Sequence, residues 1–150
     1  MRIVLFEPEI PPNTGNIARL CAATKIPLHL IEPLGFKVDD KHLRRAGLDY
    51  WPHVDVTIHP DFEDFLTKVA PPRLVMASAK AATSHHRFTF HPDDAIVLGP
   101  ETRGLPADLL ERFPESVRIP IWGEVRSLNL STATGILLYE ALRQTGLIVE

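Results

Sequence analysis

The sequence predicts an α/β fold, with a parallel sheet flanked by helices. Short apolar segments that have the length of buried strands alternate along the chain with segments of helical periodicity. Most of the 14 prolines fall between these segments, where they separate one element from the next. Repeated strand–helix units with short connections place their strands side by side in one direction. A length of 150 residues predicts one domain, residues 1–150.

The first half of the chain contains three expected strands and three expected helices. The strands are the apolar runs Ile3–Phe6 and Leu28–Ile31 and the alternating residues Val54, Val56 and Ile58. The helices are Thr14–Thr24 with Asn13 at the N-cap position, Lys41–Ala46 ended by Gly47, and a segment capped by Asp61 that runs through Val69. The core face expected of the first helix is Ile17, Leu20, Cys21 and Thr24.

The second half continues the same alternation. Its expected strands are Leu74–Ala77, Ile96–Leu98 and Val117–Ile121, and its expected helices are Ala107–Phe113 after Pro106 and Leu130–Gln144 before Gly146. The last helix has apolar residues on more than one side, because Ile136 and Tyr139 fall outside its main apolar stripe. Gly135 in its middle indicates that another backbone packs close there. Either this helix is deeply buried in a monomer, or it forms a dimer interface, which is the reading we favour for so small a domain.

Composition excludes several classes of protein. No apolar run approaches a membrane span, and the N-terminus has no signal-peptide pattern, so a cytoplasmic protein with no membrane partner is expected. The single cysteine, Cys21, rules out a disulfide within the chain. None of the seven histidines has a convincing metal-ligand spacing, and no metal is expected. A net charge of −3 is not typical of nucleic-acid-binding domains.

Three polar, glycine-containing segments carry the strongest functional signal. Residues 11–20, 97–106 and 126–135 each follow an apolar segment and lead into a helix. At the carboxyl end of a parallel strand, such a loop lets the backbone approach a ligand, and the N–H groups of the helix start hold an anion or a carbonyl oxygen. Three such loops on one small domain imply one composite site.

Other common sites are absent from the sequence. There is no phosphate-binding Gly-x-x-x-x-Gly-Lys-Ser/Thr loop, no Gly-x-Gly-x-x-Gly after the first strand and no Gly-x-Ser-x-Gly nucleophile elbow. Cys21 lies on the apolar side of its helix, which is typical of an inert thiol. Asn13, Asn16 and Arg19 offer amide and guanidinium donors that suit a phosphate or an oxyanion, although from their spacing alone capping and solvation explain them equally well.

The same loops resemble the three signature motifs of the SPOUT methyltransferases. The matching residues are Pro-Asn-Thr-Gly-Asn-Ile-Ala-Arg at 12–19, Leu-Gly-Pro-Glu-Thr-Arg-Gly-Leu at 98–105, and Ile-Pro-Ile at 119–121 followed by Arg-Ser-Leu-Asn-Leu-Ser at 126–131. They occur in the expected order, and the resemblance spans essentially the whole chain. The opening residues 6–16 and the stretch 39–50 resemble the branch that methylates the ribose of the tRNA wobble nucleotide, cytidine or uridine 34.

The resemblance implies a C-terminal deep trefoil knot, a cofactor and a set of site residues. S-adenosylmethionine would bind in the knot and leave as S-adenosylhomocysteine, with contacts from Ala77, Gly99, Glu101, Gly104, Ile119, Ser127 and Leu128. Arg19 and Asn16 would be catalytic. The tRNA anticodon loop would be bound by Asn13, Lys41, Arg44 and Arg45, with the loop Lys80–Arg87 as a further candidate for phosphate contacts. The short chain resembles the minimal branch of the class, which has no appended RNA-binding domain. The enzyme would be a homodimer held through the last helix.

One segment departs from the family pattern, and some alternatives stay open. Trp122–Val125 matches least, which leaves the roles of Trp122 and Glu124 undecided, with simple packing as the plain reading of Trp122. The expected activity is 2′-O-methylation of the wobble ribose in tRNA. The alternatives are methylation of ribosomal RNA by the same chemistry and a non-catalytic module that binds an adenosine nucleotide or RNA.

Overall fold

The computed structural model describes residues 1–38 and 48–150, with no side-chain description for 48–50. In this part of the chain one sheet of six parallel strands runs in the order β3-β2-β1-β5-β4-β6. The strands are β1 Arg2–Phe6, β2 Leu28–Ile31, β3 Val56–His59, β4 Arg73–Ala77, β5 Asp94–Leu98 and β6 Ser116–Val117. The parallel sheet flanked by helices is therefore confirmed.

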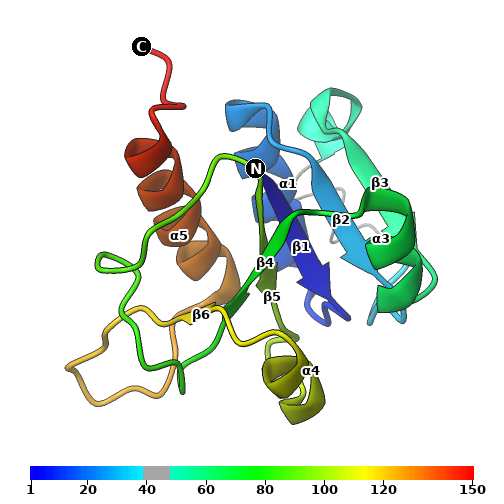
Figure 1. Ribbon diagram of the computed structural model, residues 1–150. Helices are drawn as coiled ribbons and strands as arrows, with labels where there is room; N and C mark the ends of the chain where they lie inside the picture. The colour runs from blue at the N-terminus through cyan, green and yellow to red at the C-terminus, as the bar shows by residue number, and fades with distance from the viewer. Residues whose placement is uncertain (39–47) are drawn as a thin grey trace.

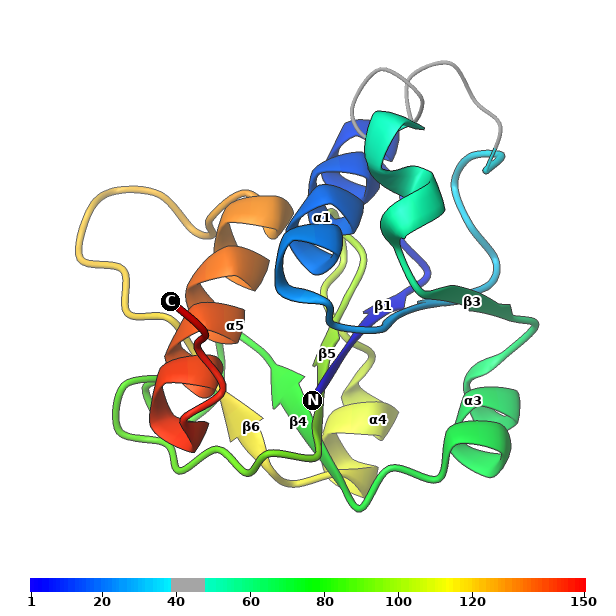
Figure 2. The same cartoon turned by 90° about the horizontal axis from the view of Figure 1, so that it is seen from above.

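Helices cover both faces of the sheet (Figures 1 and 2). The α-helices are α1 Pro11–Thr24, α3 Phe62–Val69, α4 Ala107–Arg112 and α5 Leu130–Thr145, and a 3₁₀ helix, η1, spans Leu48–His53. Helices α1 and α5 pack on one face, and α3 and α4 on the other. None of the helices in the described ranges is long and apolar enough to cross a membrane.

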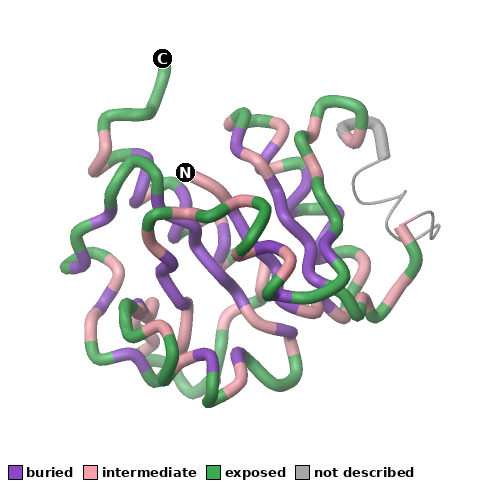
Figure 3. The backbone as a smooth tube through the Cα atoms, turned by 45° about the vertical axis from the view of Figure 1, so that its right-hand side comes forward, coloured by how far each residue is buried: buried purple, intermediate pink, exposed green. Residues whose placement is uncertain are grey.

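The alternation of side chains along a strand builds two separate cores. On β1, Ile3 and Leu5 pack toward α1 and α5, whereas Val4 and Phe6 pack toward α3 and α4. The central strands are buried on both faces, as the burial colouring along the tube shows (Figure 3). This is why these strands are continuous apolar runs in the sequence.

The strand order places a crevice at the carboxyl ends of the central strands. The chain moves outward from β1 through β2 to β3 and then returns to the other side of β1, where β5 and β4 lie. In an open parallel sheet, ligands bind outside the carboxyl ends of the strands where the order reverses, here between β1 and β5. The loops that follow β1, β4, β5 and β6 all begin at these carboxyl ends of the strands.

Several details of the elements differ from the sequence prediction. The first helix begins at Pro11 and its N-cap is Ile10, so Asn13 is not the cap; the proline ring is already set for the first helical turn. The strand expected at Val117–Ile121 is wrong beyond Val117, since Arg118 makes only an isolated bridge to Ser84 and Pro120 has no N–H to donate.

Two further expectations about helix packing are corrected. On α1, Ile17 and Cys21 are buried as expected, but Leu20 and Thr24 are only half-buried and Thr14 and Ala18 complete the core face. Within the described part of this chain, no backbone packs against Gly135, because a Cβ built there meets nothing within 4 Å. The helix expected at Lys41–Ala46 lies outside the described residues, whereas the Asp61 cap of α3 is confirmed by its bond from Asp64 N at 2.7 Å.

Candidate functional site

A cavity of about 850 Å³ lies at the carboxyl edge of the sheet. Its walls come from the loops that follow β4, β5 and β6 and from the first turns of α1 and α5. Leu98, Leu105 and Leu137 supply apolar wall. The cavity also contains all seven residues expected to hold the cofactor: Ala77, Gly99, Glu101, Gly104, Ile119, Ser127 and Leu128. The structure thus brings together residues that lie up to 51 positions apart in the sequence.

Two glycines shape the loop after β5. A Cβ at Gly99 would lie 2.4 Å from the backbone nitrogen of Leu105 and 2.5 Å from the carbonyl carbon of Gly104, so the loop folds back onto its own start. Gly104 has a φ of +67° and donates its N–H to the Pro100 carbonyl at 2.9 Å. Side chains other than glycine adopt this φ only with strain. Both glycines are therefore required by the turn that lines the cavity.

The three motif loops are joined by one chain of hydrogen bonds through Asn13. The Asn13 amide donates to Glu101 Oε2 at 3.1 Å, and its oxygen accepts from Asn129 Nδ2 at 3.0 Å. Asn129 in turn caps α5, because its side-chain oxygen accepts from Ser131 N at 2.9 Å. We call Glu101, Asn13 and Asn129 the amide chain. It ties the start of α1 to the loop after β5 and to the start of α5.

Glu101 also holds the backbone that enters α1. Its two carboxylate oxygens accept from Glu9 N at 2.9 Å and from Ile10 N at 2.8 Å. Such bonds satisfy donors that a helix start leaves without partners inside the helix. Glu101 therefore lines the cavity, yet its carboxylate is bonded to protein on both oxygens.

A reciprocal contact fixes the same two loops. The Glu9 carboxylate accepts from Thr102 N at 2.9 Å and from the Thr102 hydroxyl at 2.7 Å. The backbone and side-chain hydrogen bonds from Thr102 lower the pKa of Glu9 below its usual value. Glu9 and Glu101 thus each bind the other's loop, which holds the loop after β1 against the loop after β5.

The structure separates the residues expected to be catalytic or to bind RNA. Asn16 and Arg19 lie exposed on α1, and neither is among the residues that line the cavity within one chain. Asn13 is only 5% exposed, and its amide is bonded at both ends, which argues for a positioning role in place of the RNA contact expected of it. Lys41, Arg44 and Arg45 lie outside the described residues.

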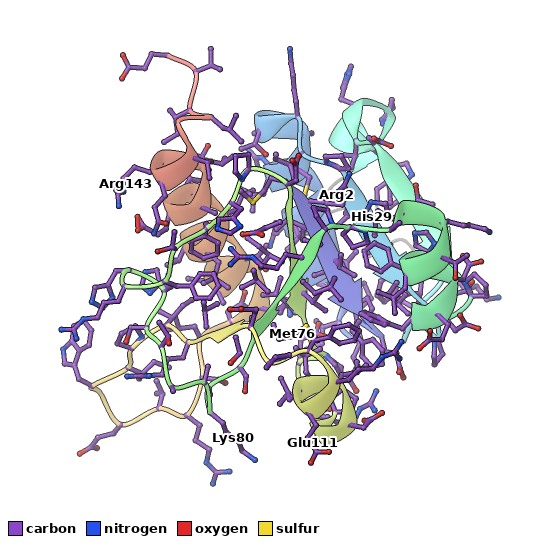
Figure 4. All side chains as sticks on the ribbon, viewed as in Figure 1. Arg2, His29, Met76, Lys80, Glu111 and Arg143 are labelled. Atoms are coloured by element: carbon purple, nitrogen blue, oxygen red, sulfur yellow. The ribbon has the colours of Figure 1, made fainter. Side chains whose placement is uncertain are left out.

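Sequence reasoning missed two parts of the site. Asn129 was not singled out, although an asparagine directly before Leu-Ser-Thr at the start of a helix is a capping signal that was available. The cavity rim also carries Arg103, Arg118 and Arg126, which come from two different loops, so no single segment is basic enough to reveal them. Lys80 extends away from the ribbon after β4 (Figure 4). In the described ranges no group of three or more His, Cys, Asp or Glu could hold a metal ion.

A second polar chain lies away from the cavity. His59 Nδ1 donates to Asp64 Oδ2 at 3.0 Å, and His29 Nδ1 lies 3.0 Å from His59 Nε2. Because an ionised Asp64 can only accept, His59 Nδ1 donates to it, which leaves His59 Nε2 to accept from His29 Nδ1. Burial lowers the pKa of His29 to about 4, with a smaller contribution from the His59 charge. None of these three residues, which we call the histidine chain, lines the cavity.

Comparison with known proteins identifies the family. The model of the SpoU rRNA Methylase family matches residues 1–139. The tRNA (cytidine(34)-2'-O)-methyltransferase of Saccharophagus degradans is 53% identical to this chain over 96% of the chain and 95% of the relative.

Two solved structures extend the comparison. One, described as giving structural insights into the 2-OH methylation of C/U34 on tRNA, is 49% identical with a TM-score of 0.90 and covers 95% of this chain and 94% of its own. The AdoMet-bound rRNA methyltransferase from Sinorhizobium meliloti is 25% identical with a TM-score of 0.85 and covers 95% of this chain and 55% of its own. The chain therefore belongs to the SpoU methylase family.

Proposed function

We propose that this protein transfers a methyl group from S-adenosylmethionine to the ribose 2′-oxygen of the wobble nucleotide, cytidine or uridine 34, in tRNA. The observation that carries the proposal is the cavity at the carboxyl ends of the strands, where the three motif loops are joined through Asn13. The substrate rests on the relative that is 53% identical and on the solved structure that concerns C/U34 of tRNA.

The residues of the cavity fit the proposed cofactor. A volume of about 850 Å³ is within the usual range of small-molecule sites. Gly99 leaves no room for a side chain in the turn beside it, and Gly104 adopts the positive φ that the turn requires. Ala77, Gly99, Gly104, Ile119, Ser127 and Leu128 would hold the cofactor, and Glu101 would keep their loops in place. When bound, S-adenosylmethionine supplies an activated methyl group on its sulfonium.

Arg19 is the side chain on which we expect the chemistry to depend most. A ribose 2′-hydroxyl is a poor nucleophile, so its oxygen must lose a proton as it attacks. A guanidinium keeps its proton at neutral pH, and its role is to donate to the developing alkoxide and to the adjacent phosphate. Asn16 lies one helical turn before it on the same flank of α1 and supplies a further amide.

We propose that the active unit is a homodimer. Arg19 and Asn16 do not line the cavity of their own chain, so a second copy is the natural source of this helix flank at the site. Helix α5 leaves Ile136 36% exposed and Tyr139 48% exposed, which provides an apolar surface for the contact. Replacement of Ile136 by aspartate should dissociate the dimer in sedimentation. A stable wild-type monomer at micromolar concentration would contradict this proposal.

The family resemblance supports three further parts of the proposal. The segment that carries residues 118–129 forms the deep trefoil knot of the class. The substrate is tRNA, and the protein acts in the cytoplasm. With a net charge of −3, contacts to RNA phosphates are local, and binding weakens with salt less steeply than for a strongly basic protein.

The direct test is methyl transfer from labelled cofactor to purified RNAs. We expect label in full tRNA and in an isolated anticodon stem-loop, and none in a stem-loop whose wobble ribose is already methylated. Ribosomal RNA is the matched competitor, because the family and its S. meliloti member are named for rRNA methylation. Label confined to ribosomal RNA would overturn the tRNA assignment, and cofactor binding without any transfer would favour the non-catalytic alternative.

A further inference from the structure

Trp122 is an exposed aromatic side chain beside the cavity. Its side chain is 93% exposed, so packing within its own chain does not account for it. It lies on the loop between β6 and α5, which extends away from the sheet (Figure 2). Ile121, directly before it, and Arg126, four residues after it, both line the cavity. Trp122 therefore lies beside residues that line the proposed active site.

The surroundings of Trp122 favour an anionic partner. Lys80, Arg103, Arg118 and Arg126 line the cavity in a chain whose net charge is −3. Arg103 lies 3.4 Å from Glu7, and Arg118 Nη1 donates to the Ala81 carbonyl at 2.9 Å. Within the described ranges, neither Lys80 nor Arg126 forms an ion pair with a carboxylate.

These cations are not explained by the cofactor. S-adenosylmethionine carries a positive sulfonium and a positive amino group against one carboxylate, so four cations around its site do not match its net charge. They match a polyanion that enters the same mouth. Single-stranded RNA presents phosphates together with unstacked bases, and it is recognised by aromatic rings set among basic side chains.

We infer that Trp122 stacks on a nucleobase of the substrate RNA next to the methylated nucleotide, while Lys80 and Arg126 contact the flanking phosphates. The inference rests on the proposed function and names the surface through which that function selects its RNA. Gly123 favours this use of the loop, because a Cβ there would meet nothing within 4 Å and the backbone beside the ring is open. Trp122 is thus an RNA-contacting residue outside the family motifs.

The chain has two tryptophans, which makes the contact directly observable. In a Trp51→Phe background, Trp122 is the sole tryptophan, and its fluorescence should be quenched on titration with an anticodon stem-loop. Replacement of Trp122 by alanine should raise the KM for the stem-loop about tenfold with little change in kcat. Trp122→Phe should restore most of this loss. Cofactor affinity, measured by calorimetry, should not change.

Val125→Ala is the matched control, because Val125 is 63% exposed on the same loop. It should leave the KM for RNA unchanged. An unchanged KM in Trp122→Ala, with wild-type methyl transfer intact, would overturn the inference and leave the proposed function standing. A shift of Trp122→Ala to a smaller species in sedimentation would also overturn it, because Trp122 would then contact a second copy. Failure of wild-type protein to methylate any RNA would instead refute the proposed function.

Discussion

The amide chain and the histidine chain each join three elements, yet they lie in different parts of the molecule. Asn13, Glu101 and Asn129 line the cavity and connect loops at the carboxyl edge of the sheet. The histidine chain connects β2, β3 and α3, and none of its members reaches the cavity. The pKa of His29, the strongly lowered histidine pKa in the described part of the chain, therefore belongs to the packing of the fold. In this protein the hydrogen bonds that join the three motif loops identify the candidate site. The shifted pKa of His29, taken alone, would have pointed to β2, β3 and α3, which lie away from the cavity.

The comparison predicts that changes near the amide chain reduce methyl transfer and that changes in the histidine chain do not. The largest effect is expected at Arg19, on the helix whose start the amide chain holds. Arg19→Ala should lower kcat by about 10²–10³-fold with saturating tRNA, because a donor to the developing alkoxide is lost. Arg19→Lys should be nearly as damaging, since lysine keeps the charge but loses the planar fork. Near-normal turnover of Arg19→Lys would rule out the fork as the reason.

The next largest effect is expected within the amide chain itself. Glu101→Gln replaces one acceptor oxygen by an NH₂ group that faces donors from Ile10 or Asn13. We expect kcat/KM to fall by about 10–100-fold and the free energy of unfolding to fall by about 2 kcal/mol. Glu111→Gln is the control, because Glu111 is exposed on α4 (Figure 4). Equal activity of the two variants would show that the amide chain does not position the site.

A smaller effect is expected at the turn that lines the cavity. Gly104→Val places a branched side chain at a φ of +67°, which costs roughly 1–2 kcal/mol and displaces the loop. Calorimetry should then show binding of S-adenosylmethionine weakened by about tenfold. Gly123→Val is the control, because a Cβ at Gly123 also meets nothing within 4 Å but Gly123 lacks the positive φ of Gly104. Undiminished binding in Gly104→Val would count against this placement of the cofactor.

The histidine chain should affect stability and leave methyl transfer unchanged. The pKa of His29 is lowered from 6.5 to about 4, so the folded state binds this proton less readily than the unfolded state. The resulting stability is present above pH 6.5 and is lost as the pH falls toward 4, by about 2 kcal/mol at pH 5. Urea unfolding at pH 7.5 and pH 5 should show this loss in the wild type and a smaller one in His29→Phe. An identical pH dependence in both proteins would contradict the assignment.

The sequence predicts the local elements better than the contacts between them. Hydrophobic periodicity predicts β1 and β2 at nearly their observed bounds, and the seven residues that the motifs predict for the cofactor all line the cavity. The bond between Asn13 and Asn129 spans 116 positions, and no local pattern specifies such a pairing. Pro120 ends β6 early because of its missing N–H, and Asn13 is buried because α1 begins at Pro11.

The exposure of Trp122 could not be predicted from sequence patterns either. A tryptophan between Ile121 and Gly123 is more often packed than exposed, and only the path of the loop decides between the two. Most of the basic rim was not predicted for a similar reason, since Arg103 lies in the loop after β5 and Arg126 in the loop after β6, and the two meet only in the fold.

Mass-spectrometric mapping of ribose methylation in tRNA incubated with the protein and S-adenosylmethionine tests the central claim most directly. The account predicts one new 2′-O-methyl group, at nucleotide 34, which is absent when Arg19→Ala replaces the wild type. Methylation found only at other nucleotides, or at nucleotide 34 with equal yield from Arg19→Ala, would contradict it.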